Sequence, residues 1–430
     1  MENRKKVVGI ILLIILLLLG ILGVRVLTRP DTVYLNETDS TQKILSVTIG
    51  GGDASWESCM NEVAAAYMKE NSDIKIVIKT TENIENIDYE KGLRIEEAKG
   101  DLDGIVEMRN VNLYQANNKL AEIPDSLADK LQEVKKIDGE VYSVPRYYSC
   151  YGMIYNKEIF EKYNLKEPKT YSEFLELCEA LKEKGIVPLA MGAGDLWHLD
   201  NWMKILFSKD VLNENPEWIS MCNEGKVHWT DQEVIHFLTD FDELFEKGYV
   251  NPEYDVAKDS ETIEQLASGQ NAMLCSGTWM FSQIEKVSPQ FQIGWFFVPS
   301  DSETDTINLD GGWEWSITKK CQEEGLYDTA VSFLEFFYRK DVYKTVLQSM
   351  NGISSLNEDV EYDMIPVQQQ IIKSAKETGK VLDASIGTGE TPEGFANKLY
   401  SYLLDMSQKK RSIQETTELL EQEWRNIVEE

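Results

Sequence analysis

Tryptophans in polar, glycine-rich contexts are the residues of this chain best suited to chemistry with a ligand. Trp197 and His198 lie in the segment Gly-Asp-Leu-Trp-His-Leu-Asp-Asn-Trp, Trp279 lies in Ser-Gly-Thr-Trp, and Trp313 lies in Gly-Gly-Trp-Glu-Trp. A flat indole face stacks on the C–H face of a sugar ring, while neighbouring carboxylates and amides hydrogen-bond to the hydroxyl groups. This pattern favours a carbohydrate-binding site.

The competing interpretation is that large aromatic side chains usually fill protein cores. For Trp218, Trp295 and Trp424 we expect that core role. For Trp197 and Trp279 we favour ligand binding.

Catalytic chemistry has little support in the sequence. The chain has three histidines, His198, His228 and His236, and lacks the HExxH, GxSxG, P-loop and GxGxxG motifs. A pair of carboxylates suited to glycoside hydrolysis arises by chance among 74 acidic residues, so such a pair is uninformative. We therefore assign no catalytic residue, no cofactor and no metal ligand, and expect a protein that is not an enzyme.

The net charge of −31, from 43 basic and 74 acidic residues, bears on the possible partners. An acidic body repels nucleic acids and anionic lipids, so we expect no nucleic-acid partner. Neutral or cationic ligands are favoured. A polyamine is therefore an alternative ligand, since carboxylates and aromatic rings together also hold a cation.

The six cysteines contain no CxxC pair. An even number outside the membrane permits disulfides. Cys178 and Cys222, however, lie in helical, apolar contexts, so we favour free, buried thiols.

The N-terminal segment has the features of a membrane anchor. Arg4, Lys5 and Lys6 precede the uncharged run Val7–Val24, and about 20 apolar helical residues span a bilayer. The alternative is a cleaved signal peptide, whose apolar region is usually shorter. We favour an uncleaved transmembrane helix within residues 1–27 and a flexible linker over 28–43, with the body on the extracellular face of the cell membrane.

The body begins with a pattern typical of a β-α-β unit. Residues 45–49 and 74–78 are apolar strands, and residues 56–70 between them have helical periodicity. Gly50–Gly52 end the first strand, where bare backbone amides can bind a ligand or simply make a tight turn. Capping boxes at Thr170 and Ser412 start later helices. With 430 residues, two α/β lobes are expected.

The order of several segments is similar to a known family. Asp138–Pro145 is followed by Tyr-Asn-Lys, Pro-Lys-Thr and Glu-Phe; Leu266–Met273 is followed by Gly-Thr-Trp; and Gly311–Thr318 reads Gly-Gly-Trp-Glu-Trp-Ser-Ile-Thr. Over about residues 44–428 the chain resembles the family 1 extracellular solute-binding proteins of ABC sugar importers, which include maltose-binding protein. Unlike many members, it has no cysteine between the apolar run and Cys59 for attachment of a lipid.

The resemblance implies an α/β, two-lobe periplasmic-binding-protein-like fold of type II, preceded by the transmembrane helix. Lobe 1 would comprise residues 44–147 and 307–353, and lobe 2 residues 148–306 and 354–430. The chain would cross between lobes near residues 144–148, 306–313 and 351–356 and close by hinge bending on a carbohydrate. The implied partners are the permease subunits of an ABC importer, with the chain as a monomer. A carbohydrate-active enzyme and a receptor-coupled sensor are the rival functions.

Loops at the strand ends facing the boundary between the lobes supply the ligand contacts in this fold. The expected binding residues are Gly51, Gly52, Asp53, Glu107 and Arg109 from lobe 1, Tyr147 at the first crossing, and Asp195, Trp197, His198, Trp279, Gly312, Trp313 and Glu314 from the later loops. Trp279 is the first candidate for a stacking platform, followed by Trp197 and Trp313. Asp195 and Glu314 would accept hydrogen bonds from hydroxyls.

Overall fold

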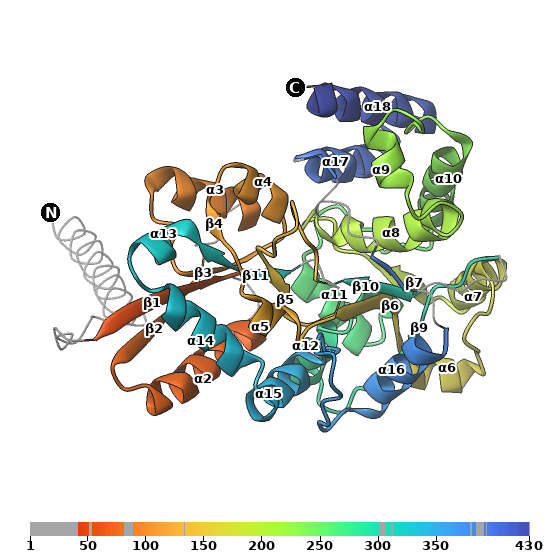
Figure 1. Cartoon of the computed structure of the whole chain (residues 1–430). Helices are drawn as coiled ribbons and strands as arrows, with labels where there is room; N and C mark the ends of the chain where they lie inside the picture. Colours follow the sequence, from red (N-terminus) through yellow and green to blue (C-terminus); the bar gives the residue numbers. More distant parts are fainter. Residues whose placement is uncertain are drawn as a thin grey trace, which may run out of the picture.

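Two mixed β-sheets organise the protein into two lobes, as a computed structural model of the chain shows (Figure 1). The structure describes residues 42–50, 54–80, 89–132, 134–301, 307–310, 313–378, 381–383, 391–392 and 394–429. The first sheet has the strand order β2-β1-β3-β11-β4, with β5 on β11. The second has the order β12-β10-β6-β8-β7, with β9 on β6.

Lobe 1 is the first sheet with its helices. Its elements are β1 Lys43–Ile49, α2 Ala54–Glu70, β2 Ile74–Thr80, α3 Tyr89–Lys99, β3 Ile105–Met108, α4 Val111–Ala116, β4 Leu120–Ala121, α5 Asp125–Ala128, β5 Val144–Pro145, β11 Glu314–Thr318, α13 Lys319–Glu323, α14 Tyr327–Phe337 and α15 Lys340–Met350.

Lobe 2 is the second sheet with its helices. Its elements are β6 Ser149–Asn156, α6 Lys157–Tyr163, α7 Tyr171–Glu183, β7 Val187–Ala190, α8 His198–Phe207, the π-helix η1 Ser208–Leu212, α9 Trp218–Asn223, α10 Gln232–Glu246, α11 Asp259–Ala267, β8 Asn271–Gly277, α12 Met280–Val287, β9 Ile293–Phe296, β10 Ile307–Asp310, α16 Pro366–Thr378, β12 Val381–Asp383, α17 Phe395–Ser407 and α18 Ile413–Glu429.

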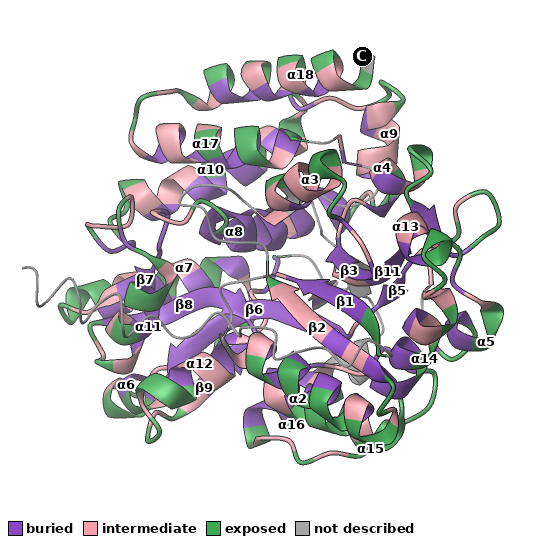
Figure 2. Cartoon of the chain, turned by 90° about the vertical axis from the view of Figure 1, so that its left-hand side faces the viewer, coloured by how far each residue is buried: buried purple, intermediate pink, exposed green. Residues whose placement is uncertain are grey.

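The β-α-β unit predicted at the start of the body is present. β1 and β2 run parallel with Leu45 opposite Ile76, and Leu45, Val47 and Ile49 are fully buried. Figure 2 shows strands that are largely buried, while α2, α15 and α18 each carry an exposed outer face. This amphipathic covering explains the helical and continuously apolar patterns of the sequence.

Both predicted caps occur, with one difference. Ser412 Oγ accepts from Glu415 N at 3.2 Å, and Ser412 N donates to the Glu415 carboxylate at 2.8 Å. Thr170 Oγ1 likewise accepts from Glu173 N at 3.1 Å. The Glu173 carboxylate, however, accepts from Lys169 N, one residue before the cap.

The expected lobe boundaries need two corrections. Leu309 of β10 pairs with Cys150 of β6, so residues 307–310 belong to the second sheet rather than to lobe 1. Leu356 forms a bridge with Leu131 and is buried in the lobe 1 core, so residues 354–356 belong to lobe 1. In both cases the boundary is set by backbone pairing with a strand or segment distant in sequence, and the local sequence pattern does not predict such pairing.

All six cysteines are buried and none of them forms a disulfide, as expected. None of the described helices combines the length and apolar composition needed to cross a membrane. The segments assigned to an anchor and a linker lie, up to residue 41, outside the described residues.

Buried hydrogen bonds surround the first crossing between the lobes. The hydroxyls of Tyr338 and Ser355 donate to the carbonyl of Pro145 at 2.7 and 3.0 Å. The Tyr343 hydroxyl donates to the carbonyl of Arg146 at 2.8 Å. These bonds fasten the end of β5 to α14, α15 and the segment after α15, because buried carbonyls must be paired.

Tyr343→Phe should lower the free energy of unfolding by about 1–2 kcal/mol, because the Arg146 carbonyl loses its buried donor. Urea unfolding monitored by circular dichroism measures the change. The control is Tyr163→Phe, a partly buried tyrosine on α6 outside this network. Equal changes in the two variants would contradict a stabilising role for the network.

Candidate functional site

A buried carboxylate organises the lobe 1 side of the candidate site. Glu107, on β3, has a side chain that is 1% exposed. It accepts hydrogen bonds from Gly50 N at 3.0 Å and from Trp56 Nε1 at 3.0 Å. It also forms an ion pair with the guanidinium of Arg146. A charge buried this deeply requires such donors, so the three groups are held in fixed positions around it.

Cations lie over the aromatic rings of this cluster. The Arg146 guanidinium is 4.7 Å from the ring centroids of both Trp56 and Tyr147 and 5.7 Å from that of Trp313. The Arg109 guanidinium is 4.2 Å from the Trp313 centroid. Trp313 itself is only partly buried. We call Trp56, Glu107, Arg109, Arg146, Tyr147 and Trp313 the Glu107 cluster.

Glu314 follows Trp313 at the start of β11. Its backbone lies opposite Met108 of β3 and Pro145 of β5, and its carboxylate accepts a hydrogen bond from Ser143 Oγ. The side chain is partly exposed, so Glu314 lies beside the Glu107 cluster.

A second buried ion pair organises the lobe 2 side. Lys204 Nζ lies 2.9 Å from the Asp200 carboxylate, one turn earlier on α8, and donates to Tyr151 Oη at 2.8 Å. The Tyr400 hydroxyl donates to Asp200 at 2.5 Å. The Trp279 ring meets Tyr151 edge-on at 5.1 Å. We call Tyr151, Asp200, Lys204, Trp279 and Tyr400 the Lys204 cluster.

Trp279 takes its position because of a glycine two residues earlier. A Cβ on Gly277 would lie 1.8 Å from the Trp279 ring. Only glycine allows this close approach. The glycine of the Gly-Thr-Trp segment is therefore needed for the position of the Trp279 ring. Trp279 is partly exposed at the start of α12.

The two clusters interact electrostatically across the lobe boundary. Burial raises the pKa of Tyr400 well above its usual range, and the Asp200 carboxylate raises it further; the positive charge of Arg109 acts in the opposite direction. Arg109 on lobe 1 is therefore within electrostatic range of Tyr400 on lobe 2. The partly exposed rings of Trp313 and Trp279 belong to clusters on opposite sides of this boundary.

The predicted residues of the Asp195 loop have structural partners. Asp195 accepts from Lys258 Nζ and from Asp259 N, both at 3.0 Å. His198 is fully buried, with Nε2 2.9 Å from the Asp259 carboxylate. Trp197 is 44% exposed. Of the three predicted residues of this loop, Trp197 therefore has the most exposed side chain for contact with a ligand.

The structure thus brings Glu107, Arg109, Tyr147, Trp313 and Glu314 together in lobe 1. Gly51, Gly52, Asp53 and Gly312 lie outside the described residues. The predictions for core tryptophans are confirmed, since Trp218, Trp295 and Trp424 are at most 3% exposed.

Sequence reasoning missed several members of both clusters: Trp56, Arg146, Tyr151, Asp200, Lys204 and Tyr400. Asp200 and Lys204 had one usable signal, an acid–base pair spaced i, i+4 on a helix. The others are joined by contacts between distant segments, which no local pattern reveals.

A model of the family described as bacterial extracellular solute-binding protein matches residues 53–344. The chain is 22% identical over 344 residues to the melibiose/raffinose/stachyose-binding protein MelE of Bacillus subtilis, covering 76% of this chain and 78% of that protein. It is 23% identical over 235 residues to the multiple sugar-binding protein of Streptococcus mutans. That match covers 54% of this chain and just over half, 56%, of the relative.

Solved structures share the fold. A chitin oligosaccharide binding protein superposes with a TM-score of 0.80 at 21% identity, covering 90% of this chain and 100% of that one. The solute-binding protein RafE in complex with raffinose gives a TM-score of 0.74 at 19% identity, with the same coverage.

The Glu107–Arg146 pair should contribute strongly to stability. Glu107→Gln should lower the free energy of unfolding by about 3 kcal/mol, because the Arg146 charge, 14% exposed, loses its counter-ion. Chemical denaturation measures this change. Glu335→Gln is the matched control; its pair with Lys130 has side chains 42% and 52% exposed, and its loss should cost about 0.5 kcal/mol or less. Similar costs for both variants would refute the organising role of Glu107.

Proposed function

Since the chain belongs to the family of bacterial extracellular solute-binding proteins, we propose that it captures a carbohydrate between its lobes and delivers it to the permease of an ABC importer. The observation that carries this proposal is the pair of partly exposed tryptophans, Trp279 and Trp313. Each lies in a cluster of buried ion pairs and hydrogen-bonding groups beside the lobe boundary. The names of the relatives, which bind melibiose, raffinose, stachyose or multiple sugars, support the same ligand class.

The two tryptophans supply stacking surfaces in this proposal. Trp313 is held by the Arg109 guanidinium, and Trp279 by Tyr151 and Gly277. Held in this way, the rings lose little conformational entropy when a sugar binds. Glu314 and the exposed Trp197 would complete the contacts, with Glu314 accepting hydrogen bonds from sugar hydroxyls.

Ligand binding is coupled to lobe closure in this account. A sugar that contacts both lobes only in the closed state shifts the equilibrium toward that state. The chain passes between the sheets at residues 146–148, between Asp310 and Glu314, and after Leu356. These connections would act as the hinge, and the permease would recognise the closed form.

The polyamine alternative can be distinguished from a sugar by experiment. Arg146 and Lys204 are already paired with Glu107 and Asp200, so salt dependence is the discriminating test: binding of a polyamine would weaken as salt rises, whereas binding of a neutral sugar would not. A carbohydrate-active enzyme is the other alternative; release of a hydrolysed glycoside by the pure protein would identify it.

Trp279→Ala should weaken binding of the cognate sugar about thirtyfold, since truncating an aromatic ring that the ligand covers costs about 2 kcal/mol. A thermal-shift screen of oligosaccharides identifies the ligand, and calorimetric titration gives the affinities. Trp295→Phe, a core substitution 3% exposed, serves as the control and should bind normally. Normal binding by the folded Trp279→Ala variant would exclude Trp279 as a platform.

Saturating sugar should reduce the radius of gyration measured by small-angle X-ray scattering, because closure brings the lobes together. The same measurement on Trp279→Ala, at a sugar concentration too low to saturate it, should give the open value. Identical scattering with and without saturating sugar would indicate a rigid site and contradict the closure mechanism.

We also propose that Val7–Val24 anchors the body, as a monomer, to the outer face of the cell membrane. The protein should then stay with membranes after a high-salt or alkaline wash and leave them only in detergent. Release of the intact body by the alkaline wash alone would argue for a peripheral or processed form.

A further inference from the structure

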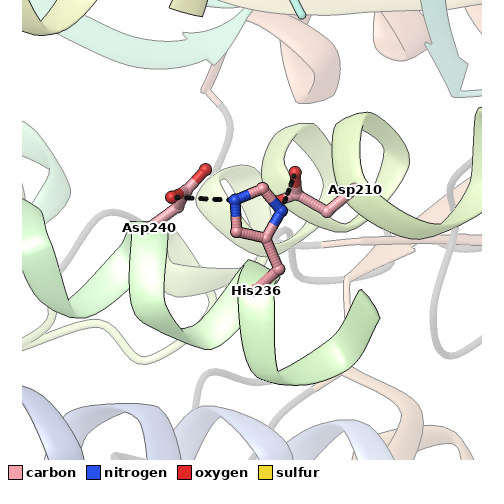
Figure 3. Close-up of side chains that lie close together, drawn as sticks. All are labelled: Asp210, His236 and Asp240. Carbon is pink, nitrogen blue, oxygen red and sulfur yellow. Dashed lines mark ion pairs between the residues drawn. The ribbon is translucent and has the colours of Figure 1, made fainter. Parts of the chain in front are cut away.

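A π-helix brings together a group of potential metal-ligating residues that is distinct from the Glu107 and Lys204 clusters. η1 continues directly from α8 and carries Asp210, while His236 and Asp240 lie one turn apart on α10. Figure 3 shows the His236 ring between the two carboxylates. His236 Nδ1 is 3.4 Å from Asp210 and Nε2 is 3.8 Å from Asp240. Single-turn π-helices are rare and occur often at functional positions.

The two carboxylates of this group are buried, so they need cations or hydrogen-bond donors as partners. The side chains of Asp210 and Asp240 are 4% and 10% exposed, whereas that of His236 is 62% exposed. Buried carboxylates are stabilised by cations, so the charge balance at this place decides what it can bind.

Lys209 pairs with only one oxygen of each carboxylate. Its ammonium group lies 2.6 Å from Asp240 Oδ2 and contacts Asp210 Oδ1. Among the described residues, no group hydrogen-bonds to the buried Asp210 Oδ2, and Asp240 Oδ1 has the distant His236 ring at 3.8 Å. Two carboxylates and one ammonium leave a net charge of −1 before the imidazole is counted, so the arrangement still favours a cation.

We propose that Asp210, His236 and Asp240 form a binding site for a divalent transition-metal ion of the zinc class. One ligand atom from each residue lies within 4.8 Å of the others. Imidazole nitrogen and carboxylate oxygen bind zinc at about 2.0–2.2 Å, so modest side-chain rotations complete the coordination, with water as the fourth ligand. Lys209 would keep its contact with Asp240 Oδ2, on the side away from His236, and orient that carboxylate. The exposed ring of His236 gives the ion access from solvent.

The ion would join η1 to α10. Because α8 continues into η1, it would also fix the far end of the helix that carries Asp200 and Lys204. The site is separate from the proposed carbohydrate site, since none of its three ligands belongs to the Glu107 or Lys204 cluster.

Titration calorimetry of the full-length chain with zinc chloride, in a non-coordinating buffer, tests the site. The wild type should bind one zinc ion per chain, and His236→Ala and Asp240→Asn should each weaken binding at least tenfold. Affinity should fall from pH 7.5 to pH 5, because a protonated imidazole does not ligate. Cobalt(II) should give the visible absorption of a tetrahedral site in the wild type and not in His236→Ala.

His228→Ala is the matched control. His228 is also partly exposed and lies 2.9 Å from a carboxylate, that of Glu421, but belongs to a pair with Arg425 nearby. It should keep wild-type affinity. Circular dichroism verifies that the exposed His236 is replaced without unfolding. Unchanged zinc affinity in His236→Ala, an equal loss in His228→Ala, or tighter binding of magnesium than of zinc would overturn the proposal.

Discussion

The buried carboxylate of Glu107 is the constraint on which the lobe 1 side of the candidate site depends. A carboxylate that is 1% exposed is tolerated only with donors around it. The donors here come from the end of β1, from α2 and from the crossing into lobe 2. Satisfying one charge therefore fixes three segments far apart in sequence. The Arg146 guanidinium, held by Glu107, in turn lies over Trp56 and Tyr147 and near Trp313.

Lobe 2 uses the same physical arrangement with different residues. Lys204 is paired with Asp200 and lies 4.4 Å from the ring centroid of Tyr151, which meets Trp279 edge-on. Each lobe thus supports a partly exposed tryptophan with a buried ion pair and an aromatic contact. In the proposed function, rings supported in this way are preorganised for stacking, and a sugar that contacts both of them would require the lobes to close.

The sequence predicted the features that depend on local pattern. The β-α-β unit, the caps at Thr170 and Ser412, and the core positions of Trp218, Trp295 and Trp424 follow from periodicity and neighbouring residues. Arg146, Trp56 and Tyr400 could not be found, because their roles come from contacts across 39 to 200 residues of chain. Residues 307–310 were assigned to lobe 1 because strand pairing with β6 has no local signature. The polar context of His198 suggested a ligand contact, whereas its ring is buried against Asp259.

We propose above all that a neutral carbohydrate binds at the lobe boundary, between the Glu107 cluster and the Lys204 cluster. The most direct measurement is a crystal structure of the chain grown with the saccharide that stabilises it most. The account predicts a sugar contacting both Trp279 and Trp313, with its hydroxyls hydrogen-bonded to neighbouring polar side chains and the lobes closed around it. A sugar bound elsewhere on the surface, or at this boundary without contact to either tryptophan, would contradict it.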